Sequence, residues 1–272
     1  MKSAYPGTQA VLRAISLLKA FTPDHPERSL AELCRGVGLN KTTAYRLLSA
    51  LESEGLVERP PGGEGYRLGP ELLALGNRAL RAGELRQAGR SELLALAQQT
   101  RETATLEVRI GRDVLILDEA LGSYVIGSTP SIGTRWPAHA TSTGKVLLAF
   151  LAEDELERWL RGPLPAPTRR TQRDPAALRR ELLRVRERGV AVSAEELEPG
   201  FVAVGAPVRQ AAGDVVAAIS VGGPKSRLTP ERVSAIAREV PAAAARISRR
   251  LGFDDRTAPR ASGPAPSRKA RP

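Results

Sequence analysis

Cysteine and histidine are nearly absent from this chain of 272 residues, which has one cysteine, Cys34, and two histidines, His25 and His139. A single cysteine excludes a disulfide within the chain, and so few Cys and His side chains argue against a zinc or other transition-metal site. We therefore expect a fold that depends on no disulfide, no metal and no other cofactor.

Long apolar runs are missing as well. No segment reaches the roughly 18 consecutive apolar residues that a membrane-spanning helix needs. The first residues, MKSAYPGTQ, lack the apolar stretch of a secretory signal. These absences predict a cytoplasmic protein without a membrane partner. The hydrophobic content of 42% is sufficient for packed cores, and the length suits two domains.

Signatures of common enzyme classes are also missing, since neither G-x-S-x-G nor H-E-x-x-H occurs. Residues 142–145 look like the end of a phosphate-binding loop, but His139 occupies the position of the first glycine and Val146 replaces the required Ser or Thr. A hydrolase that pairs Ser142 with His139 is the strongest enzymatic alternative. No carboxylate in the sequence is placed to orient that histidine, so we predict that the protein is not an enzyme.

The net charge of +11 favours a polyanionic partner such as DNA. The excess is unevenly distributed, because residues 1–70 hold nine Lys or Arg against seven Asp or Glu. Charge therefore supports a prediction of DNA binding without carrying it.

Two short amphipathic helices with a turn between them are predicted in residues 29–59. Ser29 and Glu32 have the spacing of a capping box, Gly38 suits a left-handed turn, and Asn40 is a good N-cap for the second helix. Apolar residues repeat at helical spacing in both helices. They are Leu30, Leu33, Cys34 and Val37 in the first, and Ala44, Leu47, Leu48 and Leu51 in the second.

The opposite face of the second helix is small, hydroxylated and basic. It comprises Lys41, Thr42, Thr43, Tyr45, Arg46 and Ser49. Basic side chains donate to guanine edges and phosphates, and small hydroxyl side chains fit close to base edges, so this face is typical of a recognition helix. On spacing alone, an ordinary helical hairpin with a solvated outer face is the alternative.

A hairpin follows the helix pair, with strands predicted near 56–59 and 66–68 and a Pro/Gly loop between them. Helix, turn, helix and hairpin form a winged helix-turn-helix. Arg59 and Arg67 lie on the two arms of the wing, from which they can reach phosphate or the minor groove. The sequence therefore predicts double-stranded DNA as a partner.

The rest of the chain predicts an α+β protein in which helices alternate with antiparallel strands. A helix over 8–21, with Val11, Ala14, Ile15 and Leu18 as its inner stripe, completes the winged domain at 1–69. Pro70 begins a linker helix that occupies 70–83. A second domain covers 84–252, and a disordered basic tail covers 253–272. Further helices are expected near 85–100, 153–161, 175–188 and 229–251, with another that Thr141 or Ser142 caps, and strands near 106–110, 114–118, 124–126, 190–194, 201–208 and 215–221.

The chain resembles the IclR family of bacterial transcriptional regulators over about residues 8–252. Three stretches carry the resemblance: 39–48, 136–145, and 195–200 through 217–224. It implies a C-terminal GAF-like domain, in which a curved antiparallel sheet flanked by helices holds an effector pocket. It also implies a homodimer or homotetramer on a palindromic operator, with operator affinity modulated by the bound effector.

The resemblance also assigns residues to the effector pocket: Ser142, Thr143, Ser193, Phe201, Ala203, Ser220 and Gly222. The first amides of the helix near Ser142 and Thr143 would face an anionic ligand. We therefore expect a small organic acid, with larger or aromatic acids included.

The pocket departs from the pattern of family members that bind small oxo-acids. Gly222 stands where such members have a second serine, Ala203 replaces a cysteine, and Phe201 replaces an aliphatic residue. These departures count against a ligand such as glyoxylate or pyruvate. A ligand-free architectural DNA-binding protein is a further alternative, which a C-terminal domain about twice the size of the DNA reader argues against.

Overall fold

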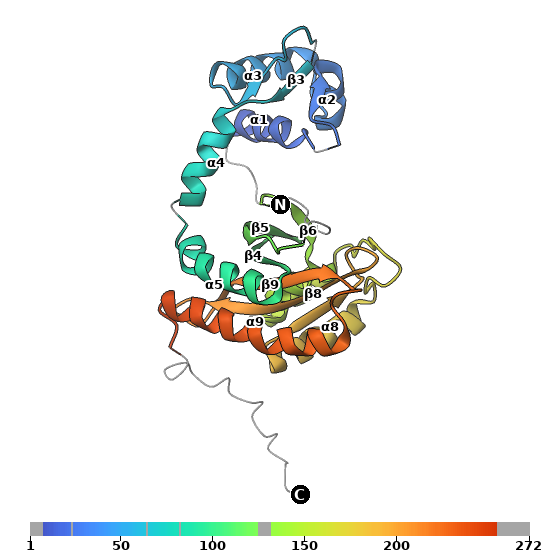
Figure 1. The fold of residues 1–272 in the computed structure, drawn as a ribbon. Helices are drawn as coiled ribbons and strands as arrows, with labels where there is room; N and C mark the ends of the chain where they lie inside the picture. Colours follow the sequence, from blue (N-terminus) through green and yellow to red (C-terminus); the bar gives the residue numbers. More distant parts are fainter. Residues whose placement is uncertain (1–7, 23, 64, 82, 125–131, 255–272) are drawn as a thin grey trace, which may run out of the picture. The chain divides into compact units, whose positions relative to one another are not determined.

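The computed structural model describes residues 8–22, 24–63, 65–81, 83–124 and 132–254 (Figure 1). The chain divides into two compact units, Met1–Ala82 and Gly83–Pro272, which are described one at a time. Most of the tail that was predicted to be disordered, from residue 255 onward, lies outside the described residues.

The N-terminal unit is a winged helix-turn-helix. Its elements are α1 (Gln9–Lys19), β1 (Glu27–Ser29), α2 (Leu30–Val37), α3 (Lys41–Ser53), β2 (Val57–Glu58), β3 (Gly65–Leu68) and α4 (Glu71–Arg81). Strand β3 lies between β1 and β2 and is antiparallel to both. Strand β1 was not predicted, because three residues are too few to show alternation and their pairing partner lies far along the chain.

Local hydrogen bonds confirm the predicted boundaries of the helix pair. Ser29 Oγ accepts from the amide of Glu32 at 3.3 Å, and the Glu32 carboxylate accepts from the amide of Ser29 at 2.8 Å, which completes a capping box. Gly38 ends α2 with φ 70°, a left-handed conformation that glycine adopts without strain. Asn40 Oδ1 accepts from the amide of Thr43 at 2.8 Å and so starts α3.

The predicted inner stripe of α1 is half right: Ala14 and Leu18 pack against the core, but Val11 and Ile15 do not. Leu17 and Phe21 are buried in the core of the winged unit, whereas Val11 is 60% exposed and Ile15 is 40% exposed. The helix is apolar on more than one side, so periodicity alone could not identify the side that meets the core.

The start of α4 is fixed to the winged unit by its backbone. The amide of Glu71 donates to the carbonyl of Gly55 at 3.2 Å, and the amide of Gly69 donates to the carbonyl of Leu56 at 2.9 Å. A Cβ at Gly69 would lie 2.2 Å from the Gly55 oxygen, so this close approach requires glycine. Farther along α4, Leu73 is 73% exposed within the single chain.

The C-terminal unit is a six-stranded antiparallel sheet with the strand order β6-β5-β4-β9-β8-β7. Its strands are β4 (Thr103–Ile110), β5 (Asp113–Ala120), β6 (Arg135–Pro137), β7 (Ala191–Ala194), β8 (Phe201–Arg209) and β9 (Val215–Pro224). Its helices are α5 (Glu84–Thr100), the 3-10 turn η1 (Ala138–Ala140), α6 (Ser142–Ala149), α7 (Glu153–Leu160), α8 (Pro175–Arg188) and α9 (Pro230–Arg250).

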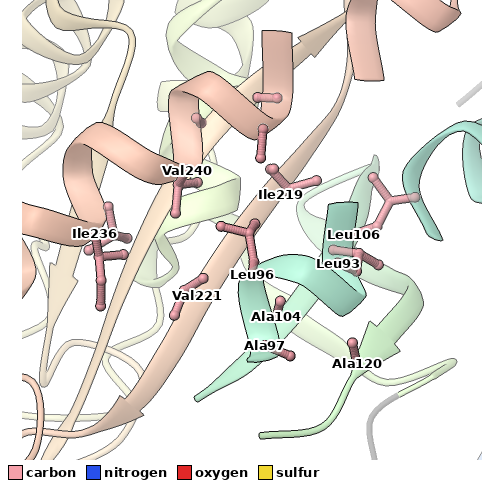
Figure 2. Packing of buried hydrophobic residues seen from close by; sticks show 14 of the residues in the cluster. Leu93, Leu96, Ala97, Ala104, Leu106, Ala120, Ile219, Val221, Ile236 and Val240 are labelled. Atoms are coloured by element: carbon pink, nitrogen blue, oxygen red, sulfur yellow. The ribbon is translucent and has the colours of Figure 1, made fainter. Parts of the chain in front are cut away.

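Helices cover both faces of this sheet. On one face, α5 and the long C-terminal helix α9 pack against β4, β8 and β9, and Figure 2 shows Leu96 of α5 beside Ile219 and Val221 of β9. On the other face, α6 packs against β8 and β9, and α7 and α8 join the same apolar core. Side chains on both faces of the central strands are therefore enclosed.

The edge next to β5 differs from the prediction. A strand was expected near 124–126, but Tyr124 lies in no strand, and Val125 and Ile126 lie outside the described residues. The neighbour of β5 is β6, in which Trp136 is opposite Val114. A loop was predicted for that segment, because a three-residue strand that contains a proline shows no alternating pattern.

Candidate functional site

The exposed face of α3 carries the side chains that were predicted to read DNA. Lys41, Thr42, Tyr45 and Arg46 are exposed, whereas Thr43 and Ser49 are partly buried. Ala44, Leu48 and Leu51 are buried on the opposite side. The sequence thus folds locally into a helix whose apolar side fixes it to the core and whose hydroxylated and basic side is free to meet another molecule.

The two arginines of the wing are each held by neighbouring side chains. The Arg59 guanidinium donates to the Tyr66 hydroxyl at 2.8 Å and lies 3.3 Å from a Glu52 oxygen. Arg67 donates to Glu58 at 2.6 Å. Both arginines remain near half exposed. They can therefore contact a phosphate only by sharing or exchanging their present partners.

The seven residues predicted to bind an effector all line one cavity of about 110 Å³ in the C-terminal unit. The cavity lies between the sheet and the start of α6. Its lining comprises Thr103, Thr105, Glu107, Ile116, Trp136, Thr141, Ser142, Thr143, Ser193, Leu197, Glu198, Phe201, Ala203, Ser220 and Gly222. Strands distant in sequence therefore bring together residues that the sequence alone leaves scattered over 120 positions.

The start of α6 is buried against this cavity. Thr141 is the N-cap, and its hydroxyl accepts from the amide of Gly144 at 3.0 Å. The amides of Ser142 and Thr143 have no hydrogen-bond partner among the described residues, although both residues are almost fully buried. Unpaired amides at a helix N-terminus are donors suited to an anion or another acceptor.

A chain of hydroxyl groups leads along the cavity wall to a buried carboxyl group. Thr143 Oγ1 donates to Glu107 Oε2 at 2.5 Å, and Thr105 Oγ1 donates to Glu107 Oε1 at 2.7 Å. Thr105 Oγ1 also lies 2.8 Å from Ser220 Oγ on the adjacent strand. On the other wall, Ser193 Oγ donates to the carbonyl of Ala140 at 2.8 Å, which holds η1 in place before α6.

Glu107 has an unusual environment for a carboxyl group. It is 5% exposed, and burial raises its pKa, an effect that the hydrogen bonds from Thr143 and Thr105 partly oppose. Among the described residues that line the cavity, none is Lys, Arg or His. The site therefore combines hydrogen-bonding groups with a carboxyl group that has no direct counter-charge.

The loop that carries Leu197 and Glu198 over the cavity is held by a fully buried lysine. Lys145 Nζ on α6 donates to Glu196 at 2.5 Å and to Glu181 on α8 at 2.6 Å. Burial raises the pKa of Glu196 although the Lys145 ammonium opposes that shift. This ion pair joins the loop to the helix whose first residues line the cavity.

Comparisons with known proteins match this architecture over nearly the whole chain. The C-terminal domain model of the bacterial transcriptional regulator IclR matches residues 77–249, and the IclR helix-turn-helix model matches residues 10–61. The chain belongs to the IclR family. It is a helix-turn-helix transcriptional regulator, and the family members to which it is similar are named as regulators, not as enzymes.

Individual IclR-family proteins show the same similarity. The Escherichia coli regulator XynR is 31% identical over 91% of this chain and 99% of its own. The crystal structure of an IclR-type regulator from Alicyclobacillus acidocaldarius superposes with a TM-score of 0.81 at 31% identity, over 89% and 98% of the two chains. An IclR homologue from Microbacterium hydrocarbonoxydans, complexed with 4-hydroxybenzoate, has a TM-score of 0.75 at 29% identity, over 89% and 98%.

Two of the predicted pocket residues, Phe201 and Gly222, share one space in the cavity wall. A Cβ added at Gly222 would lie 2.6 Å from Phe201 Cζ and 3.3 Å from Ala203 Cβ. The aromatic ring therefore fills the space that a side chain on β9 would occupy. Phe201 and Gly222 together place an apolar ring at this end of the cavity.

The hydrolase alternative finds no support in this IclR-family structure. His139 Nε2 lies 2.8 Å from the carbonyl of Pro165, its ring packs 6.2 Å from that of Trp159, and burial lowers its pKa. No hydrogen bond joins His139 to Ser142 in the described part of the chain. Within those residues, no cluster of three or more His, Cys, Asp or Glu side chains could hold a metal ion, and no helix is long and apolar enough to cross a membrane.

Glu107, Thr105 and Trp136 line the cavity and were not predicted from the sequence. In the alternating pattern of β4, Glu107 looks like a solvent-facing position. The predicted cover of helices on both sides of the sheet was the available signal, because it encloses the polar face of a central strand. Trp136 was read as loop, and β6 directs it to the cavity.

Proposed function

We propose that this IclR-family regulator binds a palindromic operator as a homodimer or homotetramer and that a small organic acid in the C-terminal cavity changes its operator affinity. The observation that carries the proposal is the cavity itself, which all seven predicted residues line, together with the unpaired amides at the start of α6. The complex of an IclR homologue with 4-hydroxybenzoate supports an acid as the ligand class. A regulator must reach the chromosome, so we keep the cytoplasm as its proposed location.

The proposed DNA contacts divide by role. Arg46 and Lys41 on α3 supply donors to bases and phosphates, and the nearby hydroxyl and phenol groups of Thr42, Thr43, Tyr45 and Ser49 contact base edges or backbone. Arg59 and Arg67 contact backbone or minor groove from the wing. The domain limits proposed for this action are 1–69 for the reader, 70–83 for the linker helix and 84–252 for the effector domain.

In the proposed mechanism the effector favours one arrangement of the oligomer over another and so shifts operator affinity. Coupling of this kind is typically about 1–3 kcal/mol, or roughly 5–150-fold in affinity. The linker helix α4 is the proposed transmitter, since its first residues are fixed to the winged unit by hydrogen bonds of Gly69 and Glu71.

A gel-shift titration tests both halves of the proposal. Arg46→Ala should weaken specific operator binding by about 1–3 kcal/mol if Arg46 reads a base. Arg238→Ala is the matched control, because it removes the same charge from an exposed position on α9. Equal affinities of the two variants would remove Arg46 from the interface. If no organic acid changes operator affinity, the ligand-free architectural alternative is favoured instead.

A further inference from the structure

The charge of the cavity does not match the ligand proposed for it. Among the described lining residues, two carry carboxyl groups, Glu107 and Glu198, and no cationic side chain accompanies them. Glu107 is one of the residues that line this cavity of about 110 Å³, so a carboxylate ligand bound there lies near it. Two carboxylates at close range repel each other, and a shared proton relieves that repulsion.

When Glu107 is ionised, the hydroxyl chain presents acceptors to the cavity. Each hydroxyl has one proton. Thr143 and Thr105 give theirs to Glu107, so Ser220 must donate to Thr105 in order to keep the 2.8 Å contact. The oxygens of Thr143 and Ser220 then offer only lone pairs to a ligand, and a carboxylate ligand needs donors.

A proton on Glu107 reverses this orientation at Thr143. The protonated carboxyl donates to Thr143 Oγ1 across the same short contact, which frees the threonine proton to point into the cavity. That hydroxyl then joins the unpaired amides of Ser142 and Thr143 as a third donor on one wall. The wall becomes suited to a carboxylate because one proton has been added and no atom has moved far.

We propose that the cavity binds a carboxylate effector together with one proton, and that Glu107 is the specificity-determining residue that holds this proton. The inference rests on the proposed function, in that the effector is taken to be an organic acid. Burial prepares Glu107 for this role, because the raised pKa lowers the free energy needed to protonate it at neutral pH.

The basic groups around Glu107 are paired with other carboxylates. The residues opposite it on β5 and β9, Ile116 and Ala218, are apolar. Charged groups of the neighbouring elements include Arg109 on β4, paired with Glu155 of α7; Asp118 on β5, paired with Arg86 and Arg90 of α5; Lys145 on α6, paired with Glu181 and Glu196; and Glu198, an exposed residue of the loop. None of these contributes to the pKa shift of Glu107, whose causes are burial and the two threonine hydrogen bonds.

Calorimetry with 4-hydroxybenzoate and with pyruvate tests the proposal on the full chain. Both acids stay ionised between about pH 6 and pH 8, because ordinary carboxyl groups titrate near 4. Titrations in two buffers of different ionisation enthalpy give the number of protons taken up. For the wild type we expect uptake to approach one proton near pH 8, with affinity falling there by nearly tenfold per pH unit.

The variant Glu107→Gln distinguishes the effect of protonation from the effect of side-chain shape, because glutamine has nearly the same shape and cannot titrate. Its amide N–H donates permanently, as the protonated carboxyl does, so this variant should bind the acid with no proton uptake and the same affinity at both ends of the pH range. Glu239→Gln on α9 is the matched control, since it removes an exposed carboxylate outside the cavity. It should keep the proton uptake of the wild type.

Three results would overturn the proposal. They are a wild type that binds acid without proton uptake, a Glu107→Gln variant that keeps the pH dependence, and failure of both acids to bind the wild type at pH 6. A gel shift with operator DNA distinguishes this from failure of the regulatory proposal. An acid that binds with a proton but leaves operator affinity unchanged supports the role of Glu107 and contradicts the regulatory link.

Discussion

Replacing the buried Lys145 with methionine tests how the loop over the cavity is held. The lysine side chain is fully buried, and its ammonium donates to Glu196 at 2.5 Å and to Glu181 at 2.6 Å. Methionine is similarly long, flexible and uncharged, so it fills most of the space while removing the charge. The variant therefore isolates the ion pairs from the packing of α6.

The expected loss follows from the exposure of the two partners. Removing one member of a buried ion pair usually costs about 3–5 kcal/mol, because the remaining charge is stranded. Glu196 is 12% exposed and Glu181 is 27% exposed, so water reaches both in part. We therefore expect about 3 kcal/mol, the lower end of that range. Glu196→Gln leaves Lys145 paired with Glu181 and should cost about 1.5 kcal/mol.

Tryptophan fluorescence in urea measures this loss in the intact chain. Both tryptophans, Trp136 and Trp159, lie in the C-terminal unit, so their signal reports the unfolding of that unit alone. With a denaturant slope of about 2 kcal/mol/M, a loss of 3 kcal/mol lowers the urea midpoint by about 1.5 M. The loss should shrink as the pH falls toward the raised pKa of Glu196, because a proton then neutralises the stranded carboxylate.

Lys225→Met is the matched control, since Lys225 is half exposed and pairs with Glu195 at the surface. A surface pair contributes at most about 1 kcal/mol, so this variant should unfold close to the wild type. If Lys145→Met shifted the midpoint no more than the control does, the buried ion pairs would not be what stabilises the loop, and the reasoning above would be refuted.

Three further predictions concern the cavity. Gly144→Ala places a Cβ 2.0 Å from the Ala138 carbonyl oxygen and should destabilise the C-terminal unit by about 3 kcal/mol, measured by the same fluorescence assay; an unchanged midpoint would mean that η1 moves aside freely. Ser220→Ala should weaken effector binding by about 1 kcal/mol in calorimetry and leave operator affinity unchanged, whereas wild-type ligand affinity would remove Ser220 from the site. Glu107→Gln should have a higher free energy of unfolding than the wild type above pH 4.5, the ordinary pKa of a Glu carboxyl, because ionising a buried carboxyl whose pKa is raised destabilises the folded wild type. In urea titrations this difference should vanish below pH 4.5, and a difference that stays constant with pH would contradict the raised pKa of Glu107.

The helix pair could be predicted closely because its signals are local. The capping box at Ser29, the left-handed Gly38 and the N-cap Asn40 each depend on residues within a few positions, and each has the predicted hydrogen bonds or dihedral angle. The hairpin and the main strands of the second unit also follow from local alternation and turn residues. Such features can be predicted without knowledge of the tertiary structure, because they depend on neighbouring residues.

Features that depend on distant partners escaped prediction. Strands β1 and β6 have three residues each, and they form by pairing with the edges of β3 and β5 respectively. The buried side of α1 depends on where Phe21 and the other core residues lie, and no periodicity distinguishes between two apolar sides of one helix.

The family resemblance predicted seven residues of the cavity lining but not the buried carboxyl group of Glu107. Ser142, Ser193 and Ser220 meet around one space as expected, and their use by a ligand remains a prediction. Glu107 was not recognised, because the alternation of β4 alone places it on a polar face, and its burial follows from the packing of α6 over the sheet, which brings Thr143 to it. The local alternation determines on which face of β4 Glu107 lies, and tertiary packing determines whether that face is exposed to solvent.

The paired arginines of the wing bear on how the protein should respond to ionic strength. A basic side chain that neutralises a phosphate normally releases a condensed cation, and each such release steepens the salt dependence of binding. Before DNA binds, Arg67 is already paired with the Glu58 carboxylate, and Arg59 is paired with Glu52. If these arginines leave their carboxylate partners to contact DNA phosphates, the freed carboxylates attract cations from solution. This uptake offsets part of the cation release from the DNA. The slope of affinity against salt should then be shallower than a count of arginines at the interface suggests.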